Sequence, residues 1–322
     1  MEYTLQQIAT RIKQAKSVLI MTHMRPDGDA FGSALALSAA LDFLKIHNQV
    51  CDESEIPSNL TFMDGVDKVR KTPQGEYDLV VTVDCSDEQR LGQLSECFFL
   101  AKRKKIDTIN IDHHVSNTRF AKYNFVGNCA ANCMHMASLV EYMGAPFDKK
   151  MAEYLLVGLL TDSGNFSHDD VKEETLLLAA KLVKAGADIH YLNEVLFKRQ
   201  PKARALLYAK TMSGMRFYHD NRFALIVVSK KNMEDCGADM GMTEGFVDFP
   251  LNIDTVEVAA SLLEVKKGQY KISLRSKTYV DVNRLAGCYG GGGHVRAAGC
   301  MLFGDLEDVL DRLSYTVSQY LE

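Results

Sequence analysis

The sequence lacks long apolar runs, which bears on where the protein can reside. Its longest unbroken apolar stretches are about seven residues, well short of the roughly 20 that a membrane-spanning helix requires. The only early apolar run, Val18–Met21, is too short for the core of a signal peptide. The eight cysteines include no C-x-x-C pair, which is typical of reduced thiols in a cytosolic protein. We therefore expect a cytoplasmic protein that does not associate with membranes.

The chain also has no excess of positive charge. Its 37 Lys and Arg residues stand against 42 Asp and Glu residues, a formal net charge of −5 at pH 7. Non-specific affinity for nucleic acid comes from massed cations, so this balance argues against a protein that coats long duplexes. The hydrophobic content of 47% and charged content of 25% are ordinary for a globular protein. At roughly 150 residues per domain, 322 residues suggest two domains.

The first part of the sequence alternates short apolar runs with helical periodicity. Ser17–Thr22, Asp78–Asp84 and Thr108–Asp112 read as strands, and their nearly continuous apolar character is typical of a parallel sheet covered on both faces. The expected helices around and after them are Leu5–Ile12, Gly32–Leu44, Cys129–Met143, Met151–Leu160 and Glu173–Lys184. This pattern predicts an α/β domain with a doubly wound parallel sheet over residues 1–187.

The rest of the chain follows a different pattern. Residues 188–215 are purely helical and more charged, which predicts a helical connector. Residues 216–322 predict a smaller α+β domain with a hairpin, two longer strands, a Gly-rich loop and a final helix. These elements are Arg216–Tyr218 with Arg222–Ser229, Val256–Val265, Tyr270–Lys277 and Leu306–Leu321.

Acidic and imidazole side chains follow each predicted strand of the first domain. The first strand leads to His23, Asp27 and Asp29, the second to Asp84, and the third to the triplet Asp112–His114. Because ligands of open α/β sheets bind outside the carboxyl ends of the strands, these side chains should meet at one edge. A further cluster, Thr161–Asn165, follows a later apolar segment and could close the same site.

A single Asp at a strand end is more often a helix cap, and a single His is more often a surface or core residue. Four such clusters are hard to explain by capping, because the carboxylates would repel one another unless cations lay among them. Carboxylates and imidazoles without thiolates suit Mn, Mg or Fe. A two-ion site with centres ~3.5–4 Å apart is a common device for displacement at phosphorus. The six candidate ligands, enough for two ions if one carboxylate bridges, are His23, Asp27, Asp29, Asp84, His113 and Asp162.

The second domain contains a glycine run from Gly290 to Gly293, followed by His294 and Arg296. Glycines let backbone N–H groups line an anion-binding concavity, although the run could also be a flexible turn. Arg275 ends a preceding predicted strand. Cationic side chains on both sides of the glycines favour the phosphate-binding interpretation.

Five motifs, in order, resemble those of the DHH–DHHA1 phosphoesterases, and together they span nearly the whole chain. They are HMRPDGDAFGS from His23, VDCSD from Val83, DHH from Asp112, LLTDSGNF from Leu159 and GGGGHVRAAG from Gly290. Among the branches of this family the chain is most similar to the NrnA-like proteins, which degrade nano-RNA and dephosphorylate pAp (3′-phosphoadenosine 5′-phosphate). The compact length and a DHHxxNxxF run that reaches Asn117 and Phe120 carry this likeness.

The resemblance implies a role for each matching residue. His23 and Asp27 would hold one Mn²⁺, with Mg²⁺ or another divalent ion as the alternative. Asp29, His113 and Asp162 would hold a second ion, and Asp84 would bridge the two as a catalytic carboxylate. His114 would face the scissile phosphate without binding metal. The nucleotide would be bound by Asn117, Arg275, Gly291, Gly292, Gly293, His294 and Arg296. Ser163 and His168 differ from many relatives, and we expect neither to touch a ligand position.

The resemblance thus implies a manganese-dependent hydrolase that cleaves short RNA to mononucleotides and pAp to AMP with a water activated by two metal ions. A cyclic-di-AMP or pApA phosphodiesterase of the same family remains an alternative. A non-catalytic nucleotide-binding regulator is a remote one, because all six ligand positions hold competent residues. An inorganic pyrophosphatase would have a different second domain, and a RecJ-type exonuclease would carry additional domains. The substrate preference, the metal and the oligomeric state stay open, with a homodimer among the options.

Overall fold

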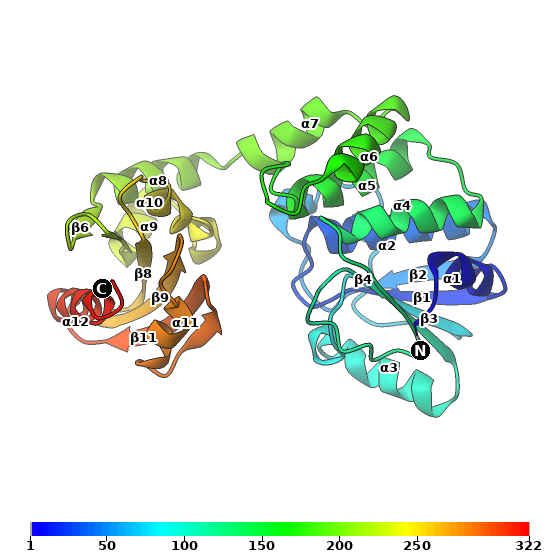
Figure 1. The fold of residues 1–322 in the computed structure, drawn as a ribbon, viewed down its shortest axis with the longest axis horizontal. Coiled ribbons are helices and arrows are strands. Elements are labelled where there is room, and N and C mark those ends of the chain that lie inside the picture. Colours follow the sequence, from blue (N-terminus) through cyan, green and yellow to red (C-terminus); the bar gives the residue numbers. More distant parts are fainter. Residues whose placement is uncertain (1, 322) are drawn as a thin grey trace. The chain divides into compact units, whose positions relative to one another are not determined.

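The computed structural model describes residues 2–321 and divides the chain into two compact units (Figure 1). Unit 1 ends at Arg199, and unit 2 begins at Gln200. Within the described residues, none of the helices is both long and apolar enough to span a bilayer.

Unit 1 contains a five-stranded sheet and its covering helices. The strands are β1 (Ser17–Met21), β2 (His47–Cys51), β3 (Leu79–Val83), β4 (Asp107–Asp112) and β5 (Tyr123–Val126). The α-helices are α1 (Leu5–Ile12), α2 (Gly28–Phe43), α3 (Leu94–Arg103), α4 (Asn132–Met143), α5 (Lys149–Asp162), α6 (Glu173–Lys184) and α7 (Ile189–Asn193). Short helical turns are η1 (Ser58–Leu60), η2 (Val66–Lys68), η3 (Gln89–Leu91) and the π-helical η4 (Glu194–Lys198).

The sheet of unit 1 is entirely parallel, with strand order β2-β1-β3-β4-β5. Alternate residues of β1 pack on opposite faces of the sheet. Val18 and Ile20 pack with helices α2, α4 and α5, whereas Leu19 and Met21 pack with α3. Figure 1 shows α2 and α4 on one face and α3 on the other. Burial on both faces explains the continuous apolar runs of these strands. The predicted doubly wound α/β fold is confirmed.

Helices α2 and α5 approach each other so closely that their backbones touch. A β-carbon at Gly32 would lie 2.5 Å from the carbonyl oxygen of Tyr154, and one at Gly28 would lie 2.5 Å from Oγ1 of Thr161. The absence of side chains at these positions brings the start of α2 beside the end of α5. The carboxylates at these two helix ends, described below, are neighbours for this reason.

Some elements differ from the sequence-based expectation. Helix α2 begins at Gly28 rather than at Gly32, because the Asp27 carboxylate accepts hydrogen bonds from the backbone N–H groups of Asp29 and Ala30 and so caps the helix earlier. Strands β2 and β5 were not expected, since the β2 sequence HNQVC contains three polar residues. An edge strand tolerates such residues because one side of it lacks a neighbouring strand.

The structure divides the segment 188–215 that the sequence suggests as one connector. Leu192 of α7 is buried in the core of unit 1, and Val195 of η4 is buried as well. Helix α8 (Lys202–Ser213) instead packs in unit 2 through Leu207, which lies with Ile226 and Val228. The boundary falls at Arg199–Gln200, just before Pro201.

Unit 2 contains a six-stranded sheet with the order β10-β11-β9-β8-β7-β6. Its pairs are antiparallel except for β7 with β8. The strands are β6 (Arg216–Tyr218), β7 (Phe223–Val228), β8 (Val258–Lys266), β9 (Gln269–Ser276), β10 (Gly292–His294) and β11 (Ala297–Phe303). Besides α8, the helices are α9 (Lys230–Cys236), η5 (Met240–Thr243), α10 (Asp248–Leu251), α11 (Val282–Gly287) and α12 (Leu306–Ser318). The mixed sheet and its helices confirm the expected α+β architecture.

The two faces of this second sheet differ. The inner face, which includes Ile272 and Leu274, packs against α11 and α12. The outer face of β7 and β8 is covered by α8 and α9, whose Leu207 and Met233 join the core. Over β9 and β11 the outer face carries side chains that are exposed, such as Phe303. The expected Gly-rich loop is in part the short strand β10.

The close contact between α2 and α5 predicts that Gly32→Ala lowers the free energy of unfolding. The added methyl group must displace the backbone of α5 near Tyr154, and such overpacking costs about 1–3 kcal/mol. Urea unfolding followed by circular dichroism measures this change. Gly287→Ala is the control, because a β-carbon there meets no atom within 4 Å. Equal stability of the Gly32→Ala variant and the wild type would contradict the described packing.

Candidate metal centre

The carboxyl ends of three strands in unit 1 carry the side chains of the candidate site. His23 lies two residues after β1, Asp84 directly follows β3, and His113 directly follows β4. Asp27 and Asp29 belong to the start of α2, and Asp162 ends α5. The sheet edge and the two helix ends bring all six predicted ligands together.

These six side chains form two groups that are joined by one carboxylate. One group contains His23, Asp27 and Asp84, the other Asp29, His113 and Asp162, and within each group the ligand atoms lie within 4.8 Å of one another. Asp84 connects them: its Oδ2 is 3.5 Å from Nε2 of His23, and its Oδ1 is 3.4 Å from Nε2 of His113. Asp84 is buried and has a positive φ of 53°, a conformation that non-glycine residues rarely adopt and that is common at functional sites.

The two imidazoles are oriented by backbone carbonyl groups. Nδ1 of His23 lies 3.0 Å from the carbonyl oxygen of Met24, and Nδ1 of His113 lies 3.0 Å from that of Cys129. A ring that donates from Nδ1 presents an unprotonated Nε2 on its other side, as metal-binding histidines do. In both residues Nε2 is the atom that faces Asp84.

Asp29 is placed by the start of α4. Its carboxylate accepts hydrogen bonds from the backbone N–H groups of Asn132 and Cys133, which have no acceptor within their own helix. The positive end of the α4 dipole therefore faces a carboxylate, which is a favourable arrangement. Asp29 itself is fully buried.

The protonation of the cluster shows how strongly its charges interact. Burial and the charge on Asp84 raise the pKa of Asp162 to about 7, and the same causes raise that of Asp29. Burial opposes the charged form of His113, but its close contact with the Asp84 carboxylate raises its pKa to about 12. The pKa of Asp84 is lowered despite burial, because the imidazoles of His113 and His23 lie against its two oxygens. The carboxylates thus need compensating positive charge.

The cluster fits divalent cations. Oδ1 of Asp84 is buried and has no hydrogen-bond partner in the described part of the chain, a costly state that a cation would relieve. The donor atoms are carboxylate oxygens and imidazole nitrogens, the set that suits Mn, Mg or Fe. The geometry is compatible with the predicted pair of ions and with a bridging position for Asp84.

His114 is held by a chain of buried polar groups. Its Nδ1 lies 2.8 Å from Oδ1 of Asp112, and Oδ2 of Asp112 accepts a hydrogen bond of 2.6 Å from the side-chain amide of Asn117. Asp112 and Asn117 are buried, whereas His114 is one-third exposed. Asp112 therefore fixes the orientation of the His114 ring. Asp112 is the first residue of the DHH motif, and the sequence pattern alone assigned no role to it.

Asn117 is placed differently from the expected substrate contact. Its amide nitrogen also lies within hydrogen-bond distance of the Cys85 carbonyl and of Asn110, and its oxygen accepts from the N–H of Arg119. A buried amide with these partners has no polar atom left for a substrate. The structure gives Asn117 a supporting position behind Asp112.

His168 contacts the backbone of Asp162 and leaves its carboxylate free. Its Nδ1 lies 2.8 Å from the carbonyl oxygen of Asp162. The turn between them is tight, because Gly164, Asn165 and Phe166 all have positive φ. The hydroxyl of Ser163 accepts a hydrogen bond from the N–H of Phe166 and stabilises this turn. These contacts fix the chain directly after Asp162.

In unit 2, Arg275 and His294 lie in one row across the sheet. Arg275 of β9 pairs with Ala297 of β11, which pairs with His294 of β10, so all three project from the outer face. His294 is exposed. Nε of Arg275 is 3.3 Å from Oδ1 of Asp248, an ion pair that is half exposed. A ligand anion at this corner would compete with Asp248 for the guanidinium group.

The glycines and Arg296 do not form the expected concavity of free N–H groups. The N–H of Gly291 donates to the Ala286 carbonyl, and that of Gly293 donates to Asn283. A β-carbon at Gly291 would lie 2.2 Å from the carbonyl oxygen of Gly299, so close strand approach requires glycine there. The guanidinium of Arg296 donates to backbone carbonyls of the 276–280 turn. Of this segment, Gly292 and His294 remain on the exposed outer face.

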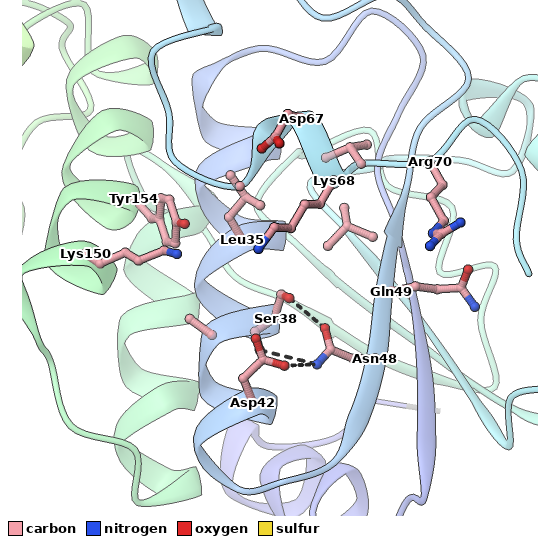
Figure 2. A pocket seen from close by; sticks show the side chains of 14 residues that line it. Leu35, Ser38, Asp42, Asn48, Gln49, Asp67, Lys68, Arg70, Lys150 and Tyr154 are labelled. Carbon is pink, nitrogen blue, oxygen red and sulfur yellow. Dashed lines mark hydrogen bonds between the residues drawn. The ribbon is translucent and has the colours of Figure 1, made fainter.

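A separate pocket of about 490 Å³ lies elsewhere in unit 1 (Figure 2). Ser38 and Asp42 of α2 line it, and in Figure 2 the Lys68 and Lys150 side chains reach toward it from two different segments. Ser38 follows Asp29 by nine residues on the same helix, a rise of about 14 Å. This pocket therefore does not belong to the metal centre.

Comparison with known proteins gives matches over both units. The family model described as the DHH family, N-terminal domain, matches residues 17–159, and that of the DHHA1 domain matches residues 223–322. Over 312 residues the chain is 32% identical to a Thermus thermophilus protein named bifunctional oligoribonuclease and PAP phosphatase NrnA, with 94% of this chain and 90% of that protein covered.

Two further matches have similar extent. A Bacillus subtilis protein of the same name is 24% identical, with 89% of this chain and 90% of that protein covered. Among solved structures, an exopolyphosphatase-related protein from Bacteroides fragilis has a TM-score of 0.87 and 26% identity, with 98% and 96% of the two chains covered. The similarity therefore extends through both units and is not confined to one motif.

The central position of Asp84 predicts that Asp84→Ala abolishes tight binding of both divalent ions. Its two oxygens face both groups of ligands, so its removal takes a donor from each. Calorimetric titration of the metal-free protein with Mn²⁺ measures the number of ions bound and their affinity. Asp67→Ala, which removes an exposed carboxylate of η2, should bind Mn²⁺ like the wild type. Two ions bound by Asp84→Ala with unchanged affinity would rule out the shared centre.

Proposed function

Because this chain belongs to the DHH–DHHA1 family and is a phosphoester hydrolase, we propose that it cleaves short RNA oligonucleotides to mononucleotides and pAp to AMP. The observation that carries the proposal is the 32% identity, over 94% of this chain, to a relative named for both activities. All six candidate ligand positions hold residues that can bind metal, and they lie in two joined groups. A non-catalytic binding protein would have no need to retain the full set.

We further propose that the ions are two Mn²⁺. His23 and Asp27 would hold one, Asp29, His113 and Asp162 the other, and Asp84 would bridge them. Bound divalent ions supply positive charge for the phosphoryl oxygens and lower the pKa of water. This part of the proposal is supported by the oxygen and nitrogen donor set and by the unpartnered oxygen of Asp84.

His114 would act on the phosphate rather than on the metal. Asp112 occupies its Nδ1, which leaves Nε2 to donate a hydrogen bond or a proton. A proton delivered to the departing oxygen would prevent the build-up of negative charge there. His114 is one-third exposed, so that a substrate can reach it.

Arg275 and His294 would bind the terminal phosphate of the nucleotide. A terminal phosphate carries more charge and more free oxygens than an internal diester, and a guanidinium group matches it with paired hydrogen bonds. The net charge of −5 agrees with small substrates, because long nucleic acids require many cations. A cytoplasmic location and a homodimer remain predictions from the sequence.

The proposed role of His114 predicts that His114→Ala lowers kcat by about 10²–10⁴-fold while two Mn²⁺ remain bound. Loss of a proton donor affects the chemical step, whereas the six ligands stay in place. Turnover of a 5′-phosphorylated dinucleotide and metal content by mass spectrometry measure the two effects. His190→Ala, on the exposed surface of α7, is the control. If the metal were lost together with activity, His114 would be a ligand instead.

The terminal-phosphate contact predicts faster cleavage of short RNA than of long RNA. With Mn²⁺, 5′-phosphorylated RNA of two to five nucleotides should be cleaved far faster than 20-mers, cyclic di-AMP or 5′-hydroxyl oligomers. Arg275→Ala should lower kcat/KM by a factor that corresponds to about 1.5–3 kcal/mol of lost transition-state stabilisation, the contribution of a charged hydrogen bond. A product time course by chromatography measures both effects, with Arg284→Ala of α11 as the control. Equal rates on 5′-phosphate, 5′-hydroxyl and cyclic substrates would instead favour the cyclic-dinucleotide alternative.

A further inference from the structure

The pocket of Figure 2 lies in unit 1, and the proposed function does not use it. Its walls are formed by helices α2 and α5, by strand β2 and by the segment 65–70, which contains η2. Its volume of about 490 Å³ lies within the range of about 300–1,000 Å³ that is usual for small-molecule sites. The side chains at its two ends determine which kind of molecule fits.

The floor of the pocket is one face of α2. Leu35, Ser38 and Asp42 are spaced by three and four residues, so they project from the same side of the helix. Leu35 is buried, and the floor continues through Ala39 and through Val50 of β2. From Leu35 to Asp42 the helix rises about 10 Å. The floor is therefore apolar at one end and carries a carboxylate at the other.

The end near Leu35 is rich in positive charge. In Figure 2 the side chains of Lys68 and Lys150 point toward each other across the pocket, one from η2 and one from α5. Lys68 is exposed and forms no salt bridge within the described residues. Nζ of Lys150 lies 2.5 Å from a carboxylate oxygen of Asp64, in an exposed ion pair of the kind that contributes little. The exposed Asp67 also lines this end. Two ammonium groups that face each other repel unless an anion lies between them.

The opposite end carries a carboxylate that no cation accompanies. Oδ1 of Asp42 accepts a hydrogen bond of 2.8 Å from the side chain of Asn48, whose own oxygen accepts one of 2.6 Å from the hydroxyl of Ser38. Asp42 is exposed, and within the described residues it forms no salt bridge. These contacts hold the carboxylate at the pocket, and its Oδ2 is left to accept a hydrogen bond from a ligand.

We propose that this pocket binds a nucleoside 5′-monophosphate whose base carries an exocyclic amino group, with AMP as the example. The phosphate lies between Lys68 and Lys150, since an ammonium group binds phosphate as a point charge. The ribose and the base lie over Leu35 and Ala39, and Asp42 accepts a hydrogen bond from the amino group. An extended nucleoside monophosphate spans a distance similar to the rise of α2 between the two ends.

AMP is chosen among such molecules because the proposed function produces it, so the identity of the ligand rests on that function. The charges and dimensions of the pocket do not. A nucleotide held here contacts α2 and α5, the helices that carry Asp29 and Asp162 at their other ends. The protein thus binds its own product at a place that is separate from the metal centre.

The test is a calorimetric titration with AMP in EDTA, on protein that carries Arg275→Ala and so lacks the proposed substrate contact. This protein should bind one AMP. Adding Lys68→Ala should weaken the binding about 10-fold or more, the loss expected for one charged hydrogen bond to phosphate. Lys68→Arg should retain the affinity, because a guanidinium group also binds phosphate. Lys71→Ala, which removes an exposed ammonium group outside the pocket, is the control.

A second ligand tests the opposite end of the pocket. Inosine 5′-monophosphate has a carbonyl oxygen in place of the amino group, and it should bind about 5-fold more weakly than AMP because this oxygen faces the Asp42 carboxylate. Absence of AMP binding, an unchanged affinity in Lys68→Ala, or equal affinities for the two nucleotides would overturn the proposal. Hydrolysis of pAp and short RNA by the wild type with Mn²⁺ tests the proposed function separately. If neither were hydrolysed while AMP bound as described, the pocket would stand and the proposed function would fall.

Discussion

Four carboxylates at one sheet edge repel one another, and the rest of unit 1 is organised around holding them there. Asp84 is completely enclosed, yet its pKa is lowered because two imidazoles lie against its oxygens. Asp29 is offset by the N-terminus of α4. The remaining excess of negative charge is what makes the cluster receptive to divalent cations. A cluster of the same shape with neutral or fully protonated side chains would not attract divalent cations.

The candidate metal ligands and the proposed substrate contacts are positioned in different ways. In unit 1, positions depend on strand ends and on helices whose backbones touch at glycines, so each ligand is fixed by buried neighbours. In unit 2, the relevant side chains stand on the uncovered outer face of a sheet, at spacings set by the strand. The first arrangement resists change, because any movement disturbs a core. The second tolerates substitution, because His294 projects into solvent.

The parallel strands and the six candidate ligands could both be predicted from the sequence, because both depend on local patterns. Apolar runs identify strands buried on both faces, and residues directly after a strand necessarily lie at its edge. The positions of Asn117 and Arg296 depend instead on partners far along the chain, such as Cys85 and Thr278, which no local pattern identifies. The same holds for the polar edge strand β2 and for the pocket of Figure 2, which exists only once α2, β2 and α5 are packed together.

The boundary at Arg199 and Gln200 has a consequence for how such a protein can evolve. All six candidate metal ligands precede the boundary, and Arg275 and His294 follow it. The candidate metal ligands are therefore encoded on one contiguous stretch of the gene, and the proposed contacts to the terminal phosphate of the substrate on another. Recombination near codon 200 exchanges the second without altering the first. Under the proposed function, such an exchange would replace the substrate contacts and leave the metal ligands unchanged.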